Sequence, residues 1–126
     1  MDQSYGEMRM LFRYRHYHVV PGKTALFNDF FQERLLPLQL CHGAQLVGRW
    51  QTEDGSEIIA LWAYESMEAY RAIEARVRAD PQSAEAQRHR RTNLDPLVTE
   101  VKQQLVFSTL PLHLTALAHL DGGTNA

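Results

Sequence analysis

The clearest element in the pattern of hydrophobic and polar positions is the run over residues 58–64, which contains seven consecutive apolar or aromatic residues. It lies between turn-forming residues and is rich in β-forming types, so it predicts a strand. A strand covered on one face only would alternate apolar and polar positions, whereas this one is apolar on both faces. Because 126 residues leave little material for a second layer, we expect a second copy of the chain to cover the other face, giving a homodimer.

The first third of the chain predicts a strand followed by a long helix. Alternating residues indicate a strand over 10–20, which a Pro-Gly pair ends, and an apolar stripe at helical spacing indicates a helix over 23–41. Pro37 lies inside that helix, where we expect a kink or a fresh turn. Gly43 is a plausible left-handed terminator of the helix.

The middle of the chain predicts a hairpin and two helices. Strands are expected over 45–52 and 57–64, joined by a turn at 53–56. Ser66 can cap the next helix, and Asp80 can cap a shorter helix over 81–91 that begins with a proline.

The end of the chain completes the sheet. The last strand is expected over 101–110, after an ambiguous stretch at 94–100. With right-handed crossovers, the order strand, helix, strand, strand, helix, strand predicts an α+β fold with a four-stranded antiparallel sheet and both helices on one face. We expect one domain over 9–110 and a C-terminal tail over 111–126 that docks as a short helix or extra strand before it frays.

Four short blocks, at 15–23, 42–50, 61–67 and 79–81, occur in an order that resembles the NIPSNAP family from about residue 11 to residue 110. The resemblance implies a ferredoxin-like βαββαβ fold that pairs sheet to sheet into a dimeric α+β barrel. The family has no agreed chemistry, and its relatives by fold include cofactor-free monooxygenases, small isomerases and haem-degrading enzymes. The chain departs from the family pattern at Arg13, where an acidic residue is common, and at Gln82 and Ser83, where an aromatic residue commonly follows the Asp-Pro pair.

Composition narrows the possible partners and the compartment. A net charge of −2 argues against nucleic acid or an anionic membrane as the main partner. The single cysteine, Cys41, excludes an intrachain disulfide and indicates a reducing compartment. The sequence has no apolar run long enough to span a bilayer and begins without a signal-like segment, so a cytoplasmic protein is expected.

Two histidines on one strand raise the possibility of a metal site. His16 and His18 are two residues apart and therefore share a strand face. Two imidazoles alone make a weak site, so a third ligand such as His42 would be required. Nothing in the sequence shows that third ligand, and we expect neither a metal site nor a bound cofactor.

The opposite face of the same strand carries Arg13, Arg15 and Tyr17. The functional interpretation is a clamp for an anion or carboxylate, with Tyr17 as a hydrogen-bond donor. The structural interpretation, which we favour, is a salt-bridge network at the subunit interface, to Glu53, Glu57 or acidic residues of the partner.

Further candidates are aromatic residues and one histidine. Trp50, Trp62 and Tyr64 lie on adjacent strands and could form the wall of a ligand pocket between sheet and helices, although Trp62 also suits the core. His42 follows the first helix, where the helix dipole alone explains a cation, but it is also the best-placed general base. Cys41 is expected to be a small buried residue and not a nucleophile.

These candidates lead to three hypotheses about function. In the first, the protein binds a small apolar or aromatic ligand in a cleft between sheet and helices, contacted by Tyr17, Trp50 and Trp62. In the second, it is a cofactor-free monooxygenase or isomerase, in which His42 or Tyr64 handles a proton and Arg15 holds developing negative charge. In the third, it is a non-catalytic interaction or scaffold module. A cavity of a few hundred Å³ with converging polar groups would favour the first hypothesis.

Overall fold

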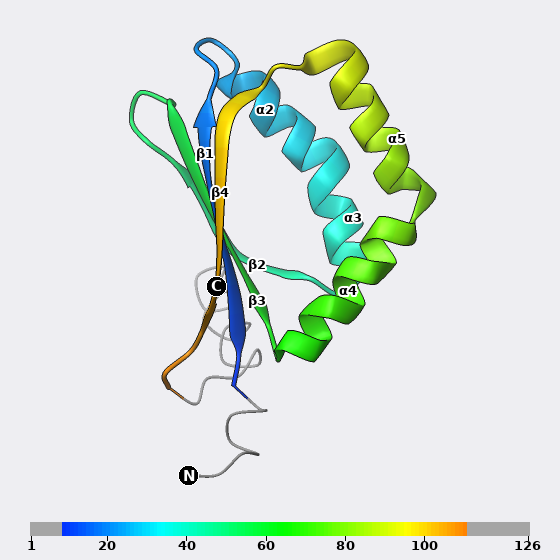
Figure 1. Ribbon diagram of the computed structural model, residues 1–126. Helices are drawn as coiled ribbons and strands as arrows, with labels where there is room; N and C mark the ends of the chain where they lie inside the picture. Colours follow the sequence, from blue (N-terminus) through cyan, green and yellow to red (C-terminus); the bar gives the residue numbers. More distant parts are fainter. Residues whose placement is uncertain (1–8, 111–126) are drawn as a thin grey trace, which may run out of the picture.

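The computed structural model describes residues 9–110. They form a four-stranded antiparallel sheet with all helices on one face (Figure 1). The strands lie in the order β2-β3-β1-β4, with the bounds β1 Leu11–Val19, β2 Gln45–Gln51, β3 Glu57–Tyr64 and β4 Val98–Phe107. The predicted ferredoxin-like α+β fold is therefore confirmed. The predicted tail at 111–126 lies outside the described residues.

The first helical stretch is interrupted where the sequence contains a proline. It consists of α2 (Thr24–Phe30), a π-helical turn η1 (Phe31–Leu35) and α3 (Leu36–Cys41). Pro37 is in the first turn of α3, where its missing N–H costs least. The predicted fresh turn at Pro37 is confirmed, and Gly43 ends the helix with a φ of 100°. Cys41 is exposed and not buried as predicted, because it is the last residue of α3, beyond the buried Leu38.

The second helical stretch contains two helices, and each begins at a predicted cap, Ser66 or Asp80. It consists of α4 (Met67–Ala79), α5 (Pro81–His89) and the π-helical turn η2 (Arg90–Leu94). Ser66 Oγ accepts a hydrogen bond from the Ala69 N–H at 3.0 Å, and Asp80 Oδ1 accepts one from the Gln82 N–H at 2.9 Å. Each cap satisfies a backbone donor that has no partner within the helix. Among the described residues, no helix is long and apolar enough to cross a membrane.

Two strands differ from the sequence-based prediction. β4 begins at Val98, three residues before the predicted start, because it pairs along the whole of β1, from Val19 opposite Val98 to Leu11 opposite Phe107. In β2 the pairing with β3 shifts between Leu46 and Gly48. Such a bulge inserts an unpaired residue and reverses the faces of the residues that follow it.

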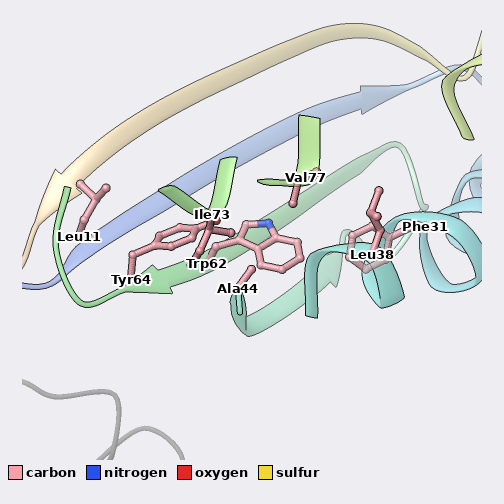
Figure 2. Close-up of a cluster of buried hydrophobic side chains, with 8 residues drawn as sticks. All are labelled: Leu11, Phe31, Leu38, Ala44, Trp62, Tyr64, Ile73 and Val77. Carbon is pink, nitrogen blue, oxygen red and sulfur yellow. The ribbon is translucent and has the colours of Figure 1, made fainter. Parts of the chain in front are cut away.

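The hydrophobic core fills the space between the sheet and the helices. Figure 2 shows one of its clusters, in which Trp62 and Tyr64 of β3 meet Ile73 and Val77 of α4 and Phe31 of η1. A second cluster lies toward the other end of β1 and includes Val19, Phe27, Phe30, Ile58, Ala86 and Leu97. The core therefore covers only one face of the sheet.

The opposite face, which we call the open face, also carries hydrophobic side chains. Strand alternation and register place the following residues on it: Phe12, Tyr14, Trp50, Ile59, Leu61 and Val106. Trp50 is 53% exposed and Val106 is 43% exposed. The sheet is thus apolar on both sides, as the run over residues 58–64 predicts.

Candidate functional site

A cavity of about 260 Å³ lies between the sheet and the helices. The residues around it come from β1, β3 and every helical segment except η2: Arg13, Arg15, Tyr17, Phe27, Phe31, Leu35, Gln39, Trp62, Glu74, Val77, Arg78, Ser83 and Gln87. This lining contains aromatic, aliphatic and charged side chains. The combination is typical of sites that bind a small organic molecule.

Arg13 is a buried charge at the sheet side of the cavity. Its side chain is 10% exposed, and its Nη1 donates to Glu74 Oε2 at 2.8 Å. Glu74 also lies 3.7 Å from the Arg78 guanidinium. Arg13 Nε is buried without a hydrogen-bond partner in the described part of the chain. Because an unpaired buried donor is unfavourable, the pairing with Glu74 leaves Arg13 incompletely satisfied.

Arg15 is held in place beside Arg13 by neighbouring side chains. Its Nε donates to the Tyr17 hydroxyl at 2.7 Å, and its Nη1 donates to Gln103 Oε1 at 2.5 Å. The guanidinium carbon also lies 5.2 Å from the centroid of the Tyr17 ring. Tyr17 packs edge-on against Phe27, with ring centroids 5.1 Å apart. These contacts fix the Arg15 guanidinium toward the cavity at little further entropic cost on binding.

The charges around the cavity favour an anion. Three arginines line it, and Glu74 is the only carboxylate among the lining residues. The partly enclosed, partly apolar surroundings strengthen the interaction of these arginines with a negative group. Trp62 and Phe31, whose ring centroids are 6.2 Å apart, form an aromatic wall nearby. The arrangement can hold a flat apolar body and a negatively charged group at the same time.

The structure brings together three of the residues selected from the sequence. Arg15, Tyr17 and Trp62 all line the cavity. Arg13 and Arg15 face the helices and not the open face, and Arg13 pairs with Glu74. The prediction that these two arginines pair with Glu53 or Glu57 is therefore wrong.

Trp50 lies away from the cavity, on the open face. Leu46 precedes the β2 bulge and packs against the core. Beyond the bulge, Arg49 takes the helix side and stacks over the Phe31 ring, with its guanidinium carbon 4.2 Å from the ring centroid. Trp50 consequently points outward, where its ring covers Gly48 so closely that a Cβ there would lie 2.3 Å from the indole. The predicted pocket role of Trp50 is wrong because the bulge reverses its face.

Tyr64 is buried at the end of β3 and does not line the cavity. It packs edge-on against Tyr70, with ring centroids 4.9 Å apart. Burial raises the pKa of the Tyr64 hydroxyl to about 12, and the nearby Arg13 charge opposes that rise. A phenol in this position keeps its proton at neutral pH, so the structure gives no support to its proposed role in proton transfer.

His42 also lies outside the cavity lining. Its Nε2 is 2.8 Å from Asp80 Oδ2, and its carbonyl accepts a hydrogen bond from Arg76 at 2.8 Å. The hydrogen bond from His42 and that from the Gln82 N–H hold the pKa of Asp80 below its usual value. The side chain thus connects the end of α3 to the junction of α4 and α5, and this contact accounts for it without catalysis.

Several cavity residues were not identified as site residues from the sequence. Phe27 and Phe31 belong to an apolar helical stripe that predicts only core, and Gln39 and Gln87 carry no local signal. For Glu74 the sequence indicated only an ion pair with Arg78, which follows it by one helical turn. Its main partner, Arg13, is 61 residues away in the sequence, and only the packing of α4 against the sheet brings them together.

Comparison with known proteins supports the family suggested by the short blocks. The NIPSNAP family profile matches residues 12–109. No curated protein matches the chain at a significant level. A NIPSNAP-like domain protein from Burkholderia xenovorans is 23% identical, with a TM-score of 0.68, covering 83% of this chain and 87% of that one. A NIPSNAP family protein of unknown function from Agrobacterium tumefaciens is 21% identical, with a TM-score of 0.70, covering 84% of this chain and 96% of that one.

A more distant structural neighbour has a different description. A candidate antibiotic biosynthesis monooxygenase from Nitrosomonas europaea is 15% identical, with a TM-score of 0.61, covering 82% of this chain and 94% of that one. At such identities the structural likeness shows the shared ferredoxin-like fold alone. The family profile, in contrast, spans most of the sequence. The chain belongs to the NIPSNAP family.

Proposed function

We propose that this protein binds a small aromatic or apolar molecule that carries a carboxylate or similar anionic group. The observation that carries the proposal is a cavity lined by three arginines, a single carboxylate and several aromatic rings. Arg15 and Arg78, both in the lining, supply donors for the anionic group. Phe31 and Trp62 supply surface for the apolar body.

The size of the cavity restricts the ligand. Its volume of about 260 Å³ is slightly below the range of roughly 300–1,000 Å³ found for drug-sized ligands. A molecule with one aromatic ring and a short acidic substituent therefore suits the site better than a fused polycyclic compound. Arg49 stacks over Phe27 and Phe31, two residues of the cavity lining. It adds positive charge close to the cavity.

A second candidate function is cofactor-free oxygenation or isomerisation of an enolisable or aromatic substrate. The neighbour from Nitrosomonas europaea motivates it, and Arg15 could stabilise negative charge that develops on such a substrate. The expected proton-handling residues, His42 and Tyr64, do not line the cavity. Glu74 is the remaining lining carboxylate, and its Oε2 already accepts a hydrogen bond from Arg13. Binding is therefore the function that we favour.

We also propose that the protein is a homodimer, joined through the open face of the sheet. The exposed Trp50 and Val106 support this arrangement, as does β4, an edge strand on which every residue after Val98 is exposed. Apolar surface of this kind marks an interface in stable soluble proteins. A non-catalytic scaffold could use the same dimer, but a scaffold function does not explain why charged side chains line the cavity.

A cytoplasmic location is part of the proposal. Cys41 is an exposed free thiol, and such thiols persist in reducing compartments.

Isothermal titration calorimetry with benzoate and benzamide tests the proposed ligand class. The two probes have nearly the same shape, but only benzoate is charged. We expect benzoate to bind and benzamide to bind at least tenfold more weakly, because a hydrogen bond to a charged group contributes roughly 1.5–3 kcal/mol. Arg15→Gln should weaken benzoate binding by a similar factor, whereas Arg71→Gln, at an exposed position on α4, should leave it unchanged. Equal affinity for both probes, or no effect of Arg15→Gln, would refute the proposal.

A further inference from the structure

The open face of the sheet carries three potential metal ligands close together. His16 and His18 lie on β1, and Glu57 is the first residue of β3. Their ligand atoms, one from each side chain, lie within 4.8 Å of one another. His16 Nε2 is 2.6 Å from Glu57 Oε1, and the two imidazole centroids are 4.9 Å apart.

The strand register brings these side chains together. Residues two apart on a strand point to the same face, which places both histidines on the side away from the helices. His18 pairs directly with Glu57 across the β1–β3 ladder. On the other side of β1, His18 pairs with Glu100 of β4, whose Oε1 lies 3.9 Å from His18 Nε2. A second carboxylate is therefore available at the edge of the cluster.

We propose that His16, His18 and Glu57 form a binding site for a divalent transition metal of the zinc type. Two imidazoles and one carboxylate are ligands that Zn²⁺ and its neighbours in the first transition row accept. Metal–ligand distances of about 2.0–2.2 Å would require His18 to move closer to the other two ligands, and His16 Nε2 and Glu57 Oε1, now 2.6 Å apart, to separate slightly. The metal would take the place of the hydrogen bond between His16 and Glu57, and Glu100 or water would complete the coordination.

The structure supplies the third ligand that the sequence did not show. His42 is bonded to Asp80 at the end of α3 and takes no part in the cluster. Glu57 takes its place because the β2–β3 hairpin returns it beside β1. The site lies on the opposite face of the sheet from Arg15 and the cavity, so it is independent of the proposed ligand. It also does not require the homodimer, although a partner on the open face would enclose it.

Titration of untagged, chelator-treated protein with Zn²⁺ alone tests this site by calorimetry. We expect saturable binding of one ion per chain, weakened at least tenfold by His18→Ala and by Glu57→Gln. Both ligand positions are partly exposed, so these variants should fold. His89→Ala removes a histidine on α5 that contacts Asn93 and Phe30 instead, and it should bind Zn²⁺ like the unchanged protein.

Cobalt substitution distinguishes this site from metal capture by the exposed thiol of Cys41. Co²⁺ bound to nitrogen and oxygen ligands should show visible d–d absorption without a thiolate charge-transfer band, and Cys41→Ser should leave the spectrum unchanged. The proposal is overturned if no stoichiometric binding occurs, or if His18→Ala and Glu57→Gln bind normally. It is equally overturned if Cys41→Ser or His89→Ala abolishes binding.

Discussion

Arg13 illustrates how a single residue organises the cavity. It occupies a position on β1 where alternation calls for a core side chain, next to Trp62 on the paired strand. A buried guanidinium is tolerated only with partners, and Glu74 provides one of them. The Nε of Arg13 remains buried without a partner among the described residues, so Glu74 compensates this charge only in part. The sequence shows an arginine among apolar residues but not which helix carries its partner.

Asp80 gives a prediction about pH at the same scale. Hydrogen bonds from His42 and the Gln82 N–H lower its pKa in the folded state, below the value of about 3.9 expected for the unfolded chain. Its contribution to stability is therefore present above about pH 4 and is lost as the pH falls through the folded-state pKa. Asp80→Asn should lower stability at pH 7 and reduce the loss of stability between neutral and acidic pH.

Urea denaturation at a series of pH values measures this effect. Glu53→Gln, in the exposed hairpin between β2 and β3, serves as the control and should show the unchanged pH dependence. An Asp80→Asn variant with the same pH profile as the original protein would show that the His42–Asp80 contact does not contribute.

At the scale of elements, periodicity and turn chemistry predicted the fold well. The apolar stripe located the first helix, Pro37 located its break, and the caps at Ser66 and Asp80 located the next two helices. The β2 bulge could not be predicted, because a one-residue insertion leaves the local hydrophobic pattern acceptable on either face. It moved Trp50 out of the candidate site. The start of β4 was also missed, since pairing with β1 and not local composition fixes it.

The cap of α4 can be tested directly. Ser66 Oγ accepts a hydrogen bond from the Ala69 N–H, and loss of such a cap costs about 1 kcal/mol. Ser66→Ala should lower the free energy of unfolding by this amount in a denaturant titration. Ser66→Asp, which retains an acceptor at the same position, should be close to the original protein. An unaffected Ser66→Ala variant would mean that water or another group caps the helix equally well.

At the scale of the whole molecule, the sheet has two apolar faces, and within residues 9–110 the helices cover one of them. Figure 1 shows every helix on the same side. The open face carries Trp50 and Val106, and the edge strand β4 presents Val101, Leu105 and Phe107 on its other side, 38% to 43% exposed. The apolar pattern of the sequence predicts that a second copy of the chain covers the open face. The cleft between sheet and helices was predicted with Tyr17 and Trp62 in its wall. The Arg13–Glu74 pair and the position of Glu57 beside the two histidines were not predicted, because each depends on side chains from separate elements.

Light scattering after size-exclusion chromatography tests the homodimer. We expect about twice the chain mass of 14.5 kDa. Trp50→Glu should weaken the dimer by roughly 2 kcal/mol or more, as central interface tryptophans do. Leu40→Glu is a matched control, because Leu40 is 50% exposed on α3, away from the sheet. A monomer at micromolar concentration, or equal effects of the two variants, would contradict the proposed interface.

The measurement that tests the account most directly is a benzoate titration followed by the indole N–H resonances of the two tryptophans in a proton–nitrogen NMR spectrum. Trp62 lines the cavity and Trp50 lies on the other face of the sheet, so each chain contains its own control. Trp50→Phe assigns the two signals. We predict that benzoate shifts the Trp62 resonance saturably, that Trp50 is unaffected and that benzamide produces the Trp62 shift only at concentrations at least tenfold higher. A Trp62 resonance that does not move at saturating benzoate, or a shift confined to Trp50, would contradict a ligand site between the sheet and the helices.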